Sequence, residues 1–67
     1  MFCPALFKAA LTARGYNVKR LAEETEINMV SLYNKIKTGR FYRGEISKIR
    51  AVLGLSNDEL ISIFFAH

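Results

Sequence analysis

The sequence predicts an all-α fold in which one domain of five short helices spans residues 1–67. Sixty-seven residues leave too little chain for a second core, so a single domain is expected. Apolar residues make up 51% of the chain and charged residues 24%, a balance typical of globular proteins. Glycine and asparagine interrupt the chain every ten to fifteen residues, with helically spaced apolar residues between them.

The first helix is expected at about residues 4–14. Pro4 suits a first helical turn, where its missing N–H is not needed. Gly15 suits a left-handed position just after the last turn. Asn17 can cap a second helix at about residues 18–25, because its side-chain oxygen can accept from free N–H groups.

A third helix is expected at about residues 29–37, with Asn28 as its N-cap. Gly39 ends it, and residues 40–43 form a basic and aromatic loop. Phe41 and Tyr42 are expected to pack under this loop, and the alternative is that they stack against a sugar.

The fourth helix is expected at about residues 44–53, ended by Gly54. Ser56 and Glu59 then form a capping box, which predicts a fifth helix at about residues 57–64. The inward stripes of the five helices define one predicted core: Leu11, Leu21, Ala22, Ile27, Leu32, Ile36, Ile46, Ile49, Leu53 and Leu60.

The charge pattern indicates a polyanionic partner. The net charge is +4, yet residues 35–50 alone carry six cations against one carboxylate, Glu45. A cationic segment on so small a domain suits nucleic acid or an anionic membrane surface. The membrane is the weaker alternative, because no helix is both strongly basic and strongly amphipathic and no apolar run approaches the roughly 18 residues of a membrane span.

Several other classes of function are excluded on the same grounds. The single cysteine, Cys3, forms no intramolecular disulfide, and no cysteine and histidine cluster could hold a metal, as expected for a protein of the cytoplasm. No nucleophile with a base, paired carboxylates or glycine-rich phosphate loop is present. We therefore expect neither an enzyme nor a cofactor.

Residues 17–39, NVKRLAEETEINMVSLYNKIKTG, have the spacing of a helix-turn-helix motif. A helix of about eight residues, a turn of three or four and a helix of about nine follow one another. Two helices that cross this closely need a small residue at their contact, and Ala22 lies at that point.

The segment LAEETEINMVSLYNKIKTG resembles the helix-turn-helix of the phage Cro and lambda-repressor superfamily, in which a Leu-Ala pair opens the motif. The following GRFYRGEISKIRAVLGLSNDEL resembles that family's next loop and helix, and the likeness runs from about residue 7 to residue 64. The resemblance implies a lambda-repressor-like domain whose second and third helices form the helix-turn-helix. It also implies a Cro-like phage or prophage transcriptional regulator that binds a double-stranded DNA operator, in the cytoplasm of a bacterial host cell and associated with its nucleoid.

The chain departs from the family pattern in the motif itself. The family usually has glycine in the turn, where this chain has Glu26, and a left-handed Glu costs roughly 1 kcal/mol. Met29 and Val30 stand at the first two recognition positions, which are commonly polar in the family.

The resemblance places four residues toward the DNA bases: Met29, Val30, Tyr33 and Asn34. Asn34 could pair with adenine N6 and N7, and Val30 or Met29 could contact thymine methyl groups. The alternative is that Met29 packs in the core and Asn34 is only solvated.

Phosphate oxygens are expected to bind the cations that flank this helix, namely Lys19, Lys37, Arg40 and Arg43. Asn17 would add the backbone N–H groups and positive dipole of a helix start. Glu23, Glu24 and Glu26 are expected to turn away from DNA. A rival interpretation is an antirepressor that masks a partner repressor protein through Met29, Val30 and Tyr33.

Five of the six positions from Leu60 to Phe65 are apolar, more than a short surface helix can bury. With Leu60 and Phe64 in the core, Ile61, Ile63 and Phe65 are left to form the interface of a weak homodimer. The alternative is a compact monomer in which the C-terminal aromatic residues fold against Phe2 and Phe7.

Overall fold

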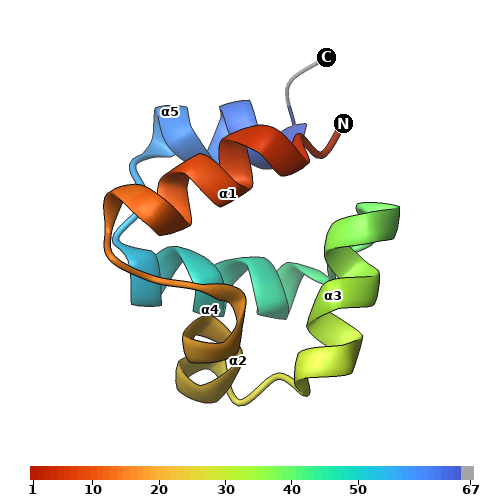
Figure 1. Cartoon of the computed structure of the whole chain (residues 1–67). Helices are drawn as coiled ribbons and strands as arrows, with labels where there is room; N and C mark the ends of the chain where they lie inside the picture. Colours follow the sequence, from red (N-terminus) through yellow and green to blue (C-terminus); the bar gives the residue numbers. More distant parts are fainter. Residues whose placement is uncertain (66–67) are drawn as a thin grey trace.

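The computed structural model describes residues 1–65, which form five helices and no strand (Figure 1). The helices are α1 (Pro4–Ala13), α2 (Val18–Thr25), α3 (Met29–Thr38), α4 (Arg43–Leu53) and α5 (Asn57–Leu60), and a single π-helical turn, η1 (Ile61–Phe65), continues α5. The predicted all-α architecture is confirmed, and the ends of the first four helices agree with the sequence to within one residue. No helix in these 65 residues is long and apolar enough to cross a membrane.

The predicted N-caps are present. The Asn17 Oδ1 accepts the backbone N–H of Arg20 at 2.8 Å, and the Asn28 Oδ1 accepts that of Val30 at 2.9 Å. The capping box of α5 is also formed, because the Ser56 Oγ accepts the Glu59 N–H while the Glu59 carboxylate accepts the Ser56 N–H. These polar side chains satisfy amide groups that a helix start leaves without partners.

The turn between α2 and α3 holds Glu26 in the left-handed region, at φ 60°. The N–H of Glu26 is thereby directed to the Ala22 carbonyl, which ends α2. The expected strain at this non-glycine position is therefore present in the fold.

The last helix differs from the prediction of a regular helix over 57–64. It is α-helical only to Leu60 and then π-helical. A π turn bonds residue i to i+5, so neighbouring residues rotate less about the axis, and Ile63 and Phe64 both face inward. Ile63 is only 3% exposed, so its assignment to a dimer interface is wrong, whereas Ile61 and Phe65 are about half exposed.

One core joins all the elements. Seven of the predicted core residues are buried: Leu11, Leu21, Ala22, Leu32, Ile36, Ile49 and Leu53. The other three, Ile27, Ile46 and Leu60, are partly buried and pack against them. Phe64 is buried as expected, and the core also contains four buried residues outside the predicted set: Phe7, Ala10, Leu55 and Ile63.

Phe2, Phe7, Phe41 and Phe64 form an aromatic cluster at one end of this core. Their ring centroids lie 5.0 to 6.2 Å apart in tilted or edge-on pairs, which suits the ring quadrupoles. The cluster joins four separate parts of the chain, and Phe41 packs beneath its loop as predicted. The same prediction for Tyr42 is wrong, because this side chain is 75% exposed. For Phe64, the alternative of packing against Phe2 and Phe7 is the one the structure adopts.

Polar contacts close the fold at both ends of α1, the Cys3 contact near the aromatic cluster and the Arg14 contacts at the far end of the helix. The Cys3 N–H donates to the Ile63 carbonyl at 2.7 Å and fastens the N-terminal segment to η1. The Arg14 guanidinium donates to the Leu53 carbonyl at 2.6 Å and to both carboxylate oxygens of Glu59, at 2.8 and 2.9 Å. The pKa of Glu59 is lowered, first by the Ser56 N–H and then by Arg14. Arg14 therefore ties α1 to the ends of α4 and α5.

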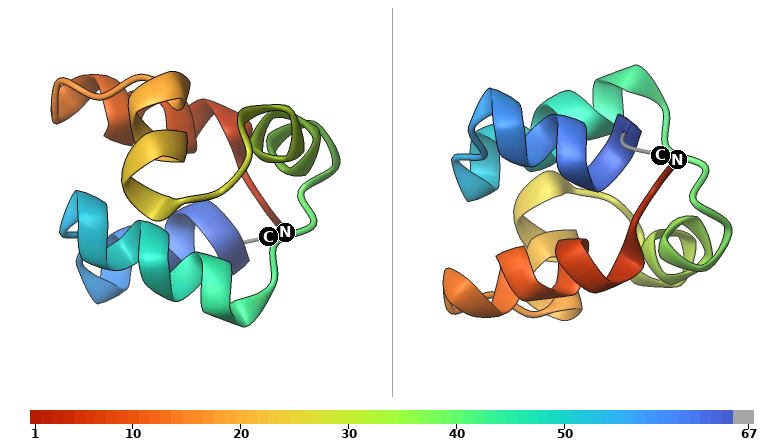
Figure 2. Two further views of the ribbon diagram at one scale, coloured as in Figure 1. Left: turned by 90° about the horizontal axis from the view of Figure 1, so that it is seen from below. Right: turned by 90° about the horizontal axis from the view of Figure 1, so that it is seen from above.

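The helices place α3 at an edge of the molecule. α2 packs against both α3 and α4, while α1 lies against η1. In all three views of Figures 1 and 2, α3 stands at one side with its long face away from the other helices.

Candidate nucleic-acid interface

α3 has one buried side and one fully open side. Leu32 and Ile36 are 0% and 6% exposed and anchor it to the core. At about 100° of rotation per residue, Asn34 lies directly opposite that buried stripe, and Val30 and Lys37 lie next to it, both on the side of Tyr33. All three are exposed, Val30 at 67%. We call Val30, Tyr33, Asn34 and Lys37 the outward face of α3.

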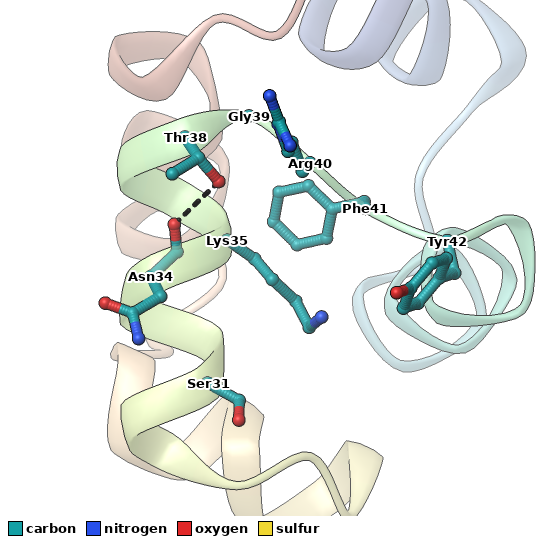
Figure 3. Close-up of a pocket in the computed structure, with 8 residues that line it drawn as sticks. All are labelled: Ser31, Asn34, Lys35, Thr38, Gly39, Arg40, Phe41 and Tyr42. Carbon is teal, nitrogen blue, oxygen red and sulfur yellow. Dashed lines mark hydrogen bonds between the residues drawn. The ribbon is translucent and has the colours of Figure 1, made fainter.

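Asn34 lies on a ridge between two hollows. On one side, α3 faces the loop that leads to α4, and Figure 3 shows Asn34 on the edge of the helix with Arg40 beyond Gly39. On the other side, Tyr33, Asn34 and Lys37 face the starts of α1 and α2. The predicted base-facing residues Tyr33 and Asn34 are therefore adjacent and accessible.

The cations predicted to bind phosphate are those outside the ion pairs of the fold. Residues 1–65 contain three ion pairs, Arg14–Glu59, Arg20–Glu24 and Lys35–Glu45. None involves the predicted phosphate-binding cations, which are all exposed: Lys19, Lys37, Arg40 and Arg43. Their charges are thus available to a polyanion.

Lys35 belongs to the cationic segment but has a different position. Its Nζ lies 3.2 Å from the Glu45 carboxylate and 4.9 Å from the centre of the Tyr42 ring. Glu45 also accepts the Tyr42 N–H at 2.9 Å. In Figure 3 the Lys35 side chain extends from α3 toward Tyr42. Lys35 therefore fixes α3 against the start of α4, a role that the sequence did not reveal.

The glutamates of α2 differ from one another. Glu24 accepts from Arg20 at 3.0 Å and from the Tyr16 hydroxyl at 3.0 Å, and this hydrogen bond raises the pKa of Tyr16. Glu23, in contrast, lines the same hollow as Lys19 and Met29. Glu23 therefore lies beside two of the residues predicted to contact DNA, a position that disfavours the expectation that it turns away from a bound polyanion.

Met29 lies beside this carboxylate and is 42% exposed, the least of the large apolar residues of α3 that reach solvent. It is neither fully in the core nor fully open. Its end of α3 is less favourable to a polyanion than the end that carries Asn34 and Lys37.

The remaining predicted phosphate-binding residues lie at helix starts, and the remaining predicted dimer residues lie on η1, away from α3. Asn17 is exposed and precedes α2, and Arg43 is the first residue of α4. Ile61 and Phe65 are 54% and 52% exposed on η1, which lies against α1 rather than α3. A homodimer interface there would be separate from the outward face of α3.

No group of three or more His, Cys, Asp or Glu residues that could hold a metal ion occurs in the part of the chain that the structure describes. Comparisons with protein-family models, with curated proteins and with solved structures give no match.

Proposed function

We propose that the protein binds double-stranded DNA sequence-specifically through the outward face of α3, as a Cro-like transcriptional regulator. The α2–α3 pair serves as a lambda-repressor-like helix-turn-helix, and the protein acts in the bacterial cytoplasm at the nucleoid. The observation that carries the proposal is an open face of α3 accompanied by exposed cations that belong to none of the three ion pairs of residues 1–65: Lys19, Lys37, Arg40 and Arg43. Cations in such positions bind phosphates, and a free helix face fits the major groove.

The roles within this surface follow from chemistry. Asn34, at the crest of α3, carries the amide that can pair with adenine, and Val30 offers a methyl surface for thymine. Lys37, Arg40 and Arg43 hold phosphates and set the register. Lys19 and Asn17 bring the start of α2 to the backbone.

The test is selection from random duplex DNA, followed by titration of the selected duplex from about 50 to 200 mM salt. Affinity is expected to fall log-linearly with salt concentration, because bound phosphates release counterions. Arg40→Ala and Arg43→Ala should weaken binding equally on selected and unrelated duplexes. A protein that binds no duplex at the lowest salt contradicts the proposal.

A protein-binding antirepressor is the second candidate, favoured by the apolar exposure of the α3 face. Val30, Tyr33 and Met29 are 67%, 54% and 42% exposed, which suits the core of a protein interface. In that case the wild-type protein binds a purified partner repressor and no DNA, and Val30→Asp abolishes the complex.

We also propose a weak homodimer through Ile61 and Phe65, because half-sites one DNA turn apart require two subunits. Analytical ultracentrifugation should detect self-association of wild type that Ile61→Asp removes. A strict monomer at every concentration, bound singly to each palindromic site, contradicts it.

A further inference from the structure

The hollow between α3 and the starts of α1 and α2 has features of a phosphate-backbone site that includes α1. It is lined by Pro4, Lys8, Val18, Tyr33, Asn34, Ile36 and Lys37, with a volume of 390 Å³. Its lining combines the apolar side chains of Pro4, Val18 and Ile36 with two exposed lysines, Lys8 and Lys37. Apolar surface beside two ammonium groups suits a deoxyribose with its flanking phosphates.

The charge of this hollow distinguishes it from other depressions of the surface. No carboxylate lines it, and none lines the hollow on the opposite flank of α3, which contains Arg40. By contrast, Glu23 lines the hollow beside Met29, and Asp58 and Glu59 line the one between α1 and α5. Three hollows contain a cation and no carboxylate: two lie on either side of Asn34, and the third, which shares Pro4 and Lys37 with the hollow of Lys8, lies at the end of α3 beside Phe2.

The positions of the hollows of Lys8 and Arg40 on the two flanks of α3 suit a helix that lies in the major groove of DNA. A major groove is about 12 Å wide, and a helix that lies in it has one sugar–phosphate strand along each flank. With Asn34 directed at the bases, the hollow with Lys8 faces one strand and the hollow with Arg40 faces the other.

We infer that Lys8 of α1 is a phosphate-binding residue, which contacts the DNA strand opposite the one held by Arg40. This inference rests on the proposed function and extends the interface from α2, α3 and the following loop to α1. Lys8 takes part in none of the three ion pairs of residues 1–65, so its charge is available.

The experiment compares Lys8→Ala with Lys48→Ala on the duplex selected by the wild-type protein. Both variants remove one lysine from an exposed helix position, but Lys48 lines neither hollow. Lys8→Ala should weaken binding about three- to tenfold and lower the salt slope by about one, while Lys8→Arg restores both. Lys48→Ala should change the affinity less than twofold and leave the slope unchanged.

Duplexes with uncharged methylphosphonates in one strand at a time give the strand assignment. Lys8→Ala should lose the least affinity relative to wild type on the duplex in which the strand assigned to Lys8 is uncharged. Arg40→Ala should lose the least on the duplex in which the opposite strand is uncharged. Equal affinities and slopes for Lys8→Ala and Lys48→Ala overturn the inference while leaving the proposed function in place. If the wild type binds no duplex, the proposed function fails and the inference fails with it.

Discussion

The aromatic cluster and the outward face of α3 use their side chains in opposite ways. In and around the cluster, groups from distant parts of the chain bind one another, as in the four packed phenylalanines and the Cys3–Ile63 hydrogen bond, and the Arg14–Glu59 pair does the same at the other end of α1. On the outward face, Asn34 and Lys37 point to solvent and contribute to none of the ion pairs of residues 1–65.

This difference predicts that substitutions in the two regions affect different properties of the protein, namely its stability and its binding. Substitutions near the cluster should change the free energy of unfolding, because every group there has an intramolecular partner. Substitutions on the outward face should leave stability nearly unchanged and alter binding alone.

The largest expected effect is a loss of stability on substitution of Phe64, compared with the small loss expected at the neighbouring Phe65. Phe64→Ala should cost about 3–5 kcal/mol of stability, because the 7% exposed ring leaves a cavity in the cluster. Phe65→Ala, at a position 52% exposed, should cost less than about 1 kcal/mol. Urea unfolding monitored by circular dichroism measures the free energy of unfolding of both variants. Similar losses would contradict a stabilising role of the aromatic cluster.

The next effect compares two arginine–glutamate pairs. Arg14→Gln should cost about 1.5–3 kcal/mol, since it removes charged hydrogen bonds to Glu59 and the Leu53 carbonyl. Arg20→Gln breaks an exposed i,i+4 pair with Glu24 and should cost only about 0.3–0.5 kcal/mol. Thermal unfolding of the two variants checks this ratio.

On the outward face, Asn34→Ala should leave the unfolding midpoint unchanged. We expect it to cost about 1–3 kcal/mol of binding free energy on the selected duplex and little on unrelated DNA. Fluorescence anisotropy with both duplexes gives the two numbers. Equal losses on the two duplexes would assign Asn34 to backbone positioning instead of base recognition.

A smaller effect of opposite sign is expected at Glu26. Glu26→Gly should stabilise the protein by up to about 1 kcal/mol, because glycine adopts φ 60° without strain. Glu23→Gly, inside α2, should instead destabilise it by about 1 kcal/mol. Destabilisation by both would mean that the turn contains no strain to relieve.

The smallest effect is the acid response of Glu59. Its pKa is lowered in the folded state by the Ser56 N–H and by Arg14, so its stabilising contribution is present above the ordinary glutamate pKa. The contribution is lost as the pH falls through the lowered pKa. Glu59→Gln should therefore show a weaker decline of the unfolding midpoint in acid than the wild type, and parallel declines would contradict this.

The sequence predicted the parts of the fold that depend on neighbouring residues. Asn17, Asn28 and Ser56 act on amide groups two or three positions away, so the helix starts could be located from local pattern. The same is true of the outward position of Asn34, which follows from the burial of Leu32 and Ile36.

The contacts between distant residues could not be predicted in this way. Phe41 belongs to no helical stripe, so its spacing does not indicate that it meets Phe64, and the contact of Phe64 with Phe2 was expected only as an alternative. The Lys35–Glu45 pair depends on the angle between two helices, and the inward turn of Ile63 depends on the π-helical geometry of η1. Each becomes visible only with the chain folded.

The hydrogen bond between Cys3 and Ile63 also affects the order in which the protein folds, because it joins residues almost the full length of the chain apart. Closing so long a segment costs more chain entropy than bringing together α2 and its neighbours α3 and α4. We therefore expect α2 and α3 to assemble early in folding and the Cys3–Ile63 hydrogen bond to form last. In native-state hydrogen exchange, the Cys3 amide should accordingly exchange through openings that leave the Leu32 amide protected.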